Sequence, residues 1–175
     1  MADRVRWGDF EVEAAELAGQ LRAMIDNAGF VYLGTIRHNG SPRVSPIEAH
    51  LVGEELMLVM IPRTQKARDV IGDPRVVLQS PIANAADPGT EFKLTGRTIT
   101  VVDGSQREAV ARQIEVASGW RPRPAWLFLA VGIERVAILE WQKDELILTR
   151  WDPSRGIHGP ERRRLDVDAG TYVRA

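Results

Sequence analysis

Residues 30–61 read FVYLGTIRHNGSPRVSPIEAHLVGEELMLVMI, and this stretch decides the expected fold. It holds three runs rich in β-branched, aromatic and other apolar residues, at about 30–37, 42–51 and 55–61. Asn39-Gly40 lies between the first two runs and Gly53-Glu54 between the second and third, and both are tight-turn sequences. Strands joined by such short turns run antiparallel, because a parallel crossover needs about a dozen residues or more.

The rest of the chain continues this pattern. Apolar residues at helical spacing predict a helix over 11–27 and shorter helices over 64–72 and 104–118. Gly96 interrupts an apolar run and indicates a bulge or bend. Further strands are expected over 75–82, 90–102, 126–141 (one long strand or two short ones) and 145–152, with a polar loop at 83–89.

These elements predict a mainly β protein with short helices and about six to seven mostly antiparallel strands. At this length, closure of the sheet into a barrel is the usual way to remove exposed strand edges. We expect one domain over residues 1–152, followed by a partly ordered tail over 153–175.

The composition argues against several classes of protein. The 23 Lys and Arg residues are balanced by 24 Asp and Glu residues, which argues against general nucleic-acid binding. There is no cysteine, so disulfides, thiol catalysis and cysteine-ligated metal sites are excluded. The N-terminus lacks the apolar core of a signal peptide, and no apolar run approaches membrane-spanning length. We therefore expect a cytoplasmic protein without membrane contact.

The common catalytic patterns are also missing. His38, His50 and His158 lie far apart and do not have the spacing of metal ligands. The sequence contains no nucleophile elbow, no Walker loop and no dinucleotide-binding glycine motif. No pair of carboxyl groups suggests a general acid and base. The sequence therefore predicts neither a catalytic side chain nor a metal site.

The first candidate site is IPRTQKARDV at 61–70, directly after the third run. A helix is expected to begin near Thr64, where free backbone N–H groups carry partial positive charge. Arg63 and Lys66 add cations, so a phosphate would find donors and charge together. The alternative, which the local sequence by itself favours, is a threonine N-cap followed by solvated polar side chains.

The second candidate is GSPRVSPIEAH at 40–50, which places Pro42 and Pro46 inside a strand pattern. Proline cannot donate to a sheet ladder, so Pro46 marks an edge, a bulge or an open ladder. An open ladder would leave backbone groups free for the polar edge of a ring system. The alternative is an ordinary proline in an edge strand.

In their order and spacing, these segments resemble the pyridoxamine 5′-phosphate oxidase-like superfamily, a group of flavin and deazaflavin oxidoreductases with a split β-barrel. The matching pieces are 29–60, TQKARDVIGDPRVVLQ at 64–79 and EFKLTGRTITVV at 91–102. The similarity covers about 15–102 well and 103–152 only loosely. The resemblance implies a split barrel and a homodimer that holds its cofactor between subunits.

The resemblance also implies a cofactor site. Thr64 and Lys66 match the phosphate-binding hydroxyl and lysine of the family, whereas Gln65 replaces the usual arginine. Arg63 or Arg68 would have to compensate for that arginine. The strand over 44–47 would lie along the cofactor ring, with residues 60 and 61 beside it. The residues implied to bind the cofactor are Val44, Ser45, Pro46, Ile47, Met60, Ile61, Arg63, Thr64, Gln65, Lys66 and Gln79.

The activity implied is that of an FMN-binding oxidoreductase, which transfers hydride to or from a small organic substrate. The deazaflavin F420 is the alternative cofactor, favoured by Gln65, and its polyglutamate tail would need a basic groove. Two non-enzyme alternatives are a cofactor-binding protein without turnover and an interaction module without cofactor. Pyridoxamine phosphate oxidase activity itself is not expected, because its C-terminal R-L-H-x-R segment is missing. The candidate groove residues are Arg63, Arg68, Arg121 and Arg123.

Tryptophans offer two interpretations. Trp120 and Trp126 flank the RPRP connector and would reach a neighbouring subunit's cofactor in a dimer. Alternatively, Trp126, Trp141 and Trp151 simply fill the barrel.

Overall fold

The computed structural model describes residues 4–82, 89–142, 145–166, 168 and 170–174. Almost all of the polar loop expected at 83–89 lies outside the described residues. The helices are α1 (Trp7–Glu13), α2 (Ala15–Ala28), α3 (Gln65–Gly72) and α4 (Gly104–Ser118). The strands are β1 (Val31–Ile36), β2 (Pro42–Ile47), β3 (Ala49–Val52), β4 (Glu55–Met60), β5 (Arg75–Gln79), β6 (Thr90–Thr100), β7 (Leu127–Gln142), β8 (Glu145–Asp152), β9 (Gly156–Asp166) and β10 (Thr171–Arg174).

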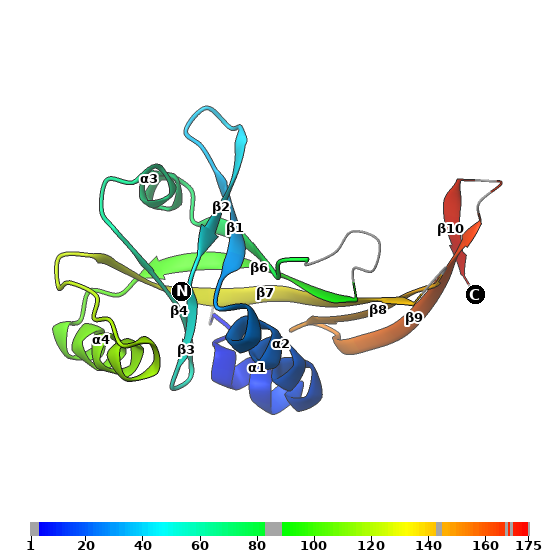
Figure 1. The fold of residues 1–175 in the computed structure, drawn as a ribbon, viewed down its shortest axis with the longest axis horizontal. Coiled ribbons are helices and arrows are strands. Elements are labelled where there is room, and N and C mark those ends of the chain that lie inside the picture. Colours follow the sequence, from blue (N-terminus) through cyan, green and yellow to red (C-terminus); the bar gives the residue numbers. More distant parts are fainter. Residues whose placement is uncertain (1–3, 83–88, 143–144, 167, 169, 175) are drawn as a thin grey trace.

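Every pairing between these strands is antiparallel, as the short turns predicted. β1 pairs with both β2 and β5, and the ladder continues through β6 to β7. β7 also pairs with β4, which pairs with β3. The chain connects β2 to β3 through Glu48, but β2 pairs with β1 whereas β3 pairs with β4. The barrel is therefore split between β2 and β3. The sheet then extends from β7 through β8 and β9 to β10 (Figure 1).

The strand count differs from the prediction for two reasons. The run over 42–51 forms two strands, because residues up to Ile47 pair with β1 and residues from Ala49 pair with β4. The tail over 153–175 contributes β9 and β10, of which β9 pairs with β8. The run over 126–141 forms the single long strand β7.

The helix expected over 11–27 is two helices. Ala14 has non-helical angles (φ −141°, ψ 52°) and ends α1, while its carbonyl accepts the N–H of Ala18 in α2. This break lets α1 turn toward the barrel and bury Trp7 and Phe10 completely. The helix therefore bends where two separate apolar faces must reach one core.

The bulge indicated by Gly96 is present. The register between β6 and β7 shifts between Thr95 and Gly96. A Cβ at Gly96 would lie 2.2 Å from the carbonyl oxygen of Gly132 on β7. The two backbones thus approach too closely for a side chain, and glycine permits the bend.

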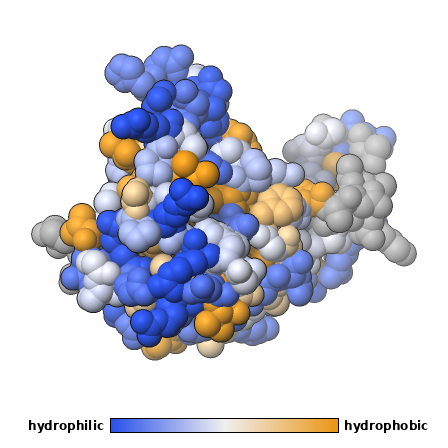
Figure 2. Space-filling model, turned by 60° about the vertical axis from the view of Figure 1, so that its left-hand side comes forward, coloured by the Kyte–Doolittle hydropathy of each residue, from blue (hydrophilic) through white to orange (hydrophobic). Residues whose placement is uncertain are grey.

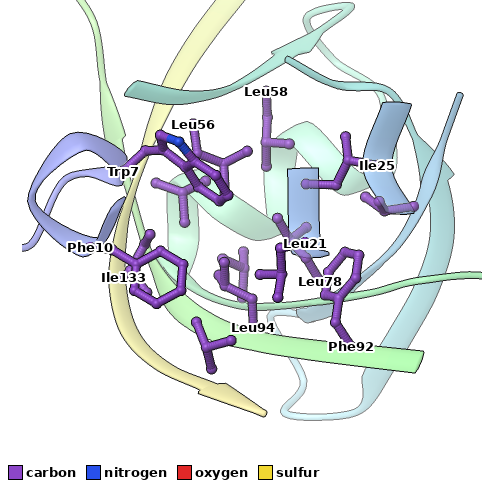
Figure 3. Packing of buried hydrophobic residues seen from close by; sticks show 14 of the residues in the cluster. Trp7, Phe10, Leu21, Ile25, Leu56, Leu58, Leu78, Phe92, Leu94 and Ile133 are labelled. Atoms are coloured by element: carbon purple, nitrogen blue, oxygen red, sulfur yellow. The ribbon is translucent and has the colours of Figure 1, made fainter. Parts of the chain in front are cut away.

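The main core fills the barrel (Figure 3). Trp7 and Phe10 from α1 meet Leu21 from α2 and strand residues such as Leu58 and Leu94. Trp151 is fully buried here, as one of the two tryptophan interpretations expected, with its ring 4.8 Å from that of Phe10. A second, smaller cluster lies between α4 and the barrel and includes Met57, Ile114 and Phe128.

Candidate functional site

A pocket of about 430 Å³ opens where β2 passes into β3, β4 ends and α3 begins. We call it the cofactor pocket, because several residues that the family resemblance implies for cofactor binding line it. Its walls combine the end of β2, the Val59–Ile61 end of β4, the first residues around α3, and two tryptophans from the connector after α4. Its volume falls within the range of about 300–1,000 Å³ that small-molecule sites occupy.

The start of α3 supplies the polar groups of the cofactor pocket. Thr64 is the N-cap: its hydroxyl accepts the N–H of Ala67 at 3.3 Å and donates to the carbonyl of Ile61 at 3.0 Å. The ammonium group of Lys66 donates to the carbonyl of Pro46 at 2.7 Å. Burial lowers the pKa of Lys66. Lys66 thus connects α3 to β2 and retains further N–H groups for a ligand.

The N-cap interpretation of Thr64 and the phosphate interpretation of Lys66 are therefore not exclusive. Thr64 fixes where the helix begins, and the first turn carries the ammonium group of Lys66 into the cofactor pocket. Pro46 presents its carbonyl to that ammonium group although it has no N–H of its own.

An aromatic wall closes the other side of the cofactor pocket. The indole N–H of Trp120 donates to the carboxylate of Glu48 at 3.1 Å, and the rings of Trp120 and Trp126 lie 5.6 Å apart. The His50 ring lies 6.3 Å from that of Trp120, and burial lowers the pKa of His50. His50 is therefore neutral at pH 7, with one ring nitrogen able to donate and one able to accept.

The connector that carries this wall is anchored to α4. Gly119 ends α4 with a left-handed conformation (φ 77°), which turns the chain back along the helix. The Arg107 guanidinium donates to the carbonyls of Pro124 and Trp126. Trp120 and Trp126 therefore reach the cofactor pocket of their own chain. The sequence signal for this was the pair of tryptophans flanking RPRP.

The structure brings six of the eleven predicted cofactor residues to one pocket. They are Pro46, Ile47, Met60, Ile61, Thr64 and Lys66. Residues that the sequence analysis did not assign to the site also line it, above all Glu48 and His50. The available signal was their position shortly after Pro46, within the same strand pattern.

The other five residues lie elsewhere. Val44 is largely exposed, and Ser45 faces the opposite side of β2 with a buried hydroxyl that has no partner among the described residues. Gln65 lies on the far side of α3, next to the β1–β2 hairpin. Arg63 is exposed, and the Gln79 amide donates to buried Glu91 at 3.0 Å. Rotation by about 100° per helical residue turns Gln65 away from the side of α3 that Lys66 faces.

The four arginines proposed for a basic groove also do not gather at one place. Arg121 forms ion pairs with Glu108 and Glu115 on α4. Arg68 lies on the same side of α3 as Gln65. Among the described residues that line the cofactor pocket, Lys66 is the cation with a fixed positive charge.

These residues fit a flat ligand with an anionic group. Trp120, Trp126 and the end of β4 offer aromatic and aliphatic walls, and Lys66 offers positive charge at one end. Lys66 is the one fixed cation that these described residues offer to the anion. The described residues contain no cluster of three or more side chains able to hold a metal ion.

Comparison with known proteins identifies the fold. A NimC/NimA family protein from Clostridium acetobutylicum matches with a TM-score of 0.56 and 19% identity, over 70% of this chain and 88% of the other. A protein from Listeria innocua provisionally named as a pyridoxamine 5′-phosphate oxidase matches with a TM-score of 0.58 and 15% identity, over 70% and 98%. This chain shares the split-barrel fold of these proteins, which is the fold that the resemblance to the pyridoxamine 5′-phosphate oxidase-like superfamily implied. The resemblance inferred from the sequence is thus confirmed at the level of fold.

A haem-binding protein from Mycobacterium smegmatis shares the same fold, with a TM-score of 0.56 and 16% identity over 72% of this chain. The match spans 56% of that protein's length. No protein-family model and no curated protein matches the sequence. No helix in the described residues is long and apolar enough to cross a membrane.

Proposed function

We propose that this protein is an FMN-binding oxidoreductase that transfers hydride to or from a small organic substrate. The observation that carries the proposal is the cofactor pocket itself: Lys66 and the N-cap of α3 lie at one end of a cavity walled by Trp120 and Trp126. The split-barrel fold shared with a superfamily of flavin proteins supports it.

Bound FMN would supply the hydride chemistry, and the protein would bind and orient it. The Lys66 ammonium group would hold the phosphate through a charge-assisted hydrogen bond. Val59, Met60 and Ile61 would exclude water from one side of the ring, and the two tryptophans from the other. His50, neutral at pH 7, would offer a donor and an acceptor to ring or substrate without adding charge.

F420 remains the alternative cofactor. Lys66 is the one Lys or Arg among the described residues of the cofactor pocket, so a single fixed cation faces the phosphate. One cation would hold the FMN phosphate only weakly. This arrangement favours a ligand whose remaining anionic groups bind elsewhere. Haem is a second candidate ligand, because the imidazole of His50 lines the same pocket and is held neutral, the form that ligates iron. A cofactor-binding protein without turnover would use the same contacts.

The test is a set of fluorescence and absorbance titrations with FMN, F420 and haemin. It compares the unchanged protein with Lys66→Ala and with Lys93→Ala, whose lysine lies outside the cofactor pocket. We expect FMN to bind and Lys66→Ala to weaken it about 10- to 100-fold, since a hydrogen bond to a charged group contributes about 1.5–3 kcal/mol. Lys93→Ala should bind FMN as the unchanged protein does.

Each other outcome has a defined meaning. Tighter binding of F420 or haemin would replace FMN as the cofactor, and failure of all three to bind would refute the cofactor pocket. If FMN binds but the reduced form is never reoxidised by a panel of small electrophiles, the protein is a carrier and the oxidoreductase proposal fails.

A further inference from the structure

A second cavity, of about 560 Å³, lies between the β1–β2 hairpin and α3. We call it the hairpin cavity. Four arginines line it (Arg37, Arg43, Arg68 and Arg75) together with two aspartates, so the arginines exceed the carboxylates by two positive charges. The molecule as a whole carries a formal net charge of −1. The excess of positive charge at this cavity is therefore local.

Both aspartates are occupied by contacts within the protein. Asp69 is buried and accepts the Thr35 hydroxyl at 2.9 Å and the Arg43 Nε–H at 2.7 Å. Asp73 pairs with Arg75, which lowers the pKa of that carboxyl group to about 2. Each carboxylate is therefore already paired with one arginine of the cavity, Asp69 with Arg43 and Asp73 with Arg75.

The remaining guanidinium groups are free to bind an anion. Arg43 contacts Asp69 through Nε, which leaves its two terminal nitrogens for the cavity. In the part of the chain that the structure describes, the side chains of Arg37 and Arg68 have no hydrogen-bond or ion-pair partner. His38 adds a further ring nitrogen at the hairpin tip. This end of the molecule is strongly hydrophilic, as the top of Figure 2 shows.

The walls of the hairpin cavity restrict the class of anion. Among the described residues that line it, Ile36 is the one large apolar residue, and none is Phe, Tyr or Trp. A ligand with a large flat ring would find no stacking surface there. Several guanidinium groups converging on a polar cavity match a group with several phosphates, because arginine binds phosphate oxygens in pairs.

We propose that the hairpin cavity binds an oligophosphate group. The site is separate from the cofactor pocket, because α3 lies between them: Gln65 and Arg68 face the hairpin cavity, whereas Thr64 and Lys66 face the other side. Either inorganic tripolyphosphate or the phosphate chain of a nucleotide can supply this group.

The test is calorimetric titration with tripolyphosphate, ATP and citrate at constant ionic strength. It compares the unchanged protein, the double variant Arg37→Ala/Arg68→Ala, and the control Arg112→Ala/Arg123→Ala, which removes two exposed arginines elsewhere. We expect one tripolyphosphate to bind per chain. The affinity should fall at least about tenfold in Arg37→Ala/Arg68→Ala and change less than about twofold in the control. ATP binding tighter than tripolyphosphate would identify a nucleotide as the source.

Three results would overturn the proposal: no tripolyphosphate binding, equal binding by the Arg37→Ala/Arg68→Ala variant, or citrate binding as tight as tripolyphosphate. Melting temperatures of all variants check that each is folded. FMN titration of the same variants separates this proposal from the cofactor pocket. Lys66→Ala should retain tripolyphosphate, and the Arg37→Ala/Arg68→Ala variant should retain FMN.

Discussion

Residues of the short helix α3 face two different cavities. Gln65 faces the hairpin cavity, Lys66 reaches the carbonyl of Pro46 in the cofactor pocket, and Asp69 is buried beneath the β1–β2 hairpin. Sequence similarity assigned Gln65 and Lys66 to one phosphate site, because they occupy the family's arginine and lysine positions. The direction of each side chain from the helix axis separates them.

Asp69 permits a stability prediction. Replacing it with alanine leaves the Arg43 guanidinium, whose side chain is only 20% exposed, without its carboxylate partner. We expect Asp69→Ala to lower the free energy of unfolding by about 3 kcal/mol, the scale for breaking a buried pair. Urea denaturation measures this. Asp73→Ala, which removes a more exposed pair, should change it less, and equal effects would contradict the structural role of Asp69.

At the scale of elements, turn and proline signals were informative, and strand ends were less so. The Asn39-Gly40 and Gly53-Glu54 turns correctly gave antiparallel pairing. Pro46 marked an edge, a bulge or an open ladder, and β2 is an edge strand whose ladder with β1 continues through Pro46 to Ile47. No turn residue in the sequence indicated the helix break at Ala14. Packing of α1 against the core imposes this break.

The crossing of β6 and β7 gives a second prediction. Gly96→Ala places a methyl group against the carbonyl oxygen of Gly132, and we expect it to lower the free energy of unfolding by about 1–3 kcal/mol or more. Gly19→Ala is the matched control, since nothing lies within 4 Å of its Cβ position on α2. It should raise stability by about 0.5–1 kcal/mol. If Gly96→Ala melts like the unchanged protein, the close approach is incorrect.

The pairing of β8 with β9 should depend on pH. Hydrogen bonds from Arg163 and Arg150 lower the pKa of Glu161 from an ordinary 4.5 to about 2. These contacts therefore add stability above pH 4.5, and that stability is lost as the pH falls from about 4.5 toward 2. Thermal melting from pH 7 to 2.5 should show Glu161→Gln losing less stability on acidification. A variant with the same pH profile as the unchanged protein would contradict this.

At the scale of the whole molecule, the outer face of β1, β2 and β5 carries an apolar strip of Tyr32, Val44 and Val77, which are 40%, 69% and 38% exposed. Val44 and Val77 lie opposite the same residue of β1, Gly34, so the strip is continuous across the three strands. Exposed apolar area of this kind is typical of protein interfaces. We infer that it supports the homodimer implied by the family resemblance.

Sedimentation velocity tests this inference. We expect the unchanged protein to sediment as a dimer and Val44→Asp to shift it toward monomer, because a buried, unpaired carboxylate opposes association. Val116→Asp, which alters an even more exposed valine on α4, should leave the dimer intact. If the unchanged protein and Val44→Asp are both monomers, or both dimers, the assignment of this face is refuted.

The sequence by itself determined the β class, the antiparallel pairing, the bulge at Gly96 and the helix start at Thr64. Each depends on contacts within a few residues or on the properties of glycine, proline and a capping hydroxyl. Only the tertiary structure decided that Trp120 and Trp126 line the cofactor pocket, that Gln65, Val44 and Gln79 do not, and that the tail adds two strands. These outcomes depend on how elements distant in sequence pack together, and periodicity carries no information about which distant partner a face will meet.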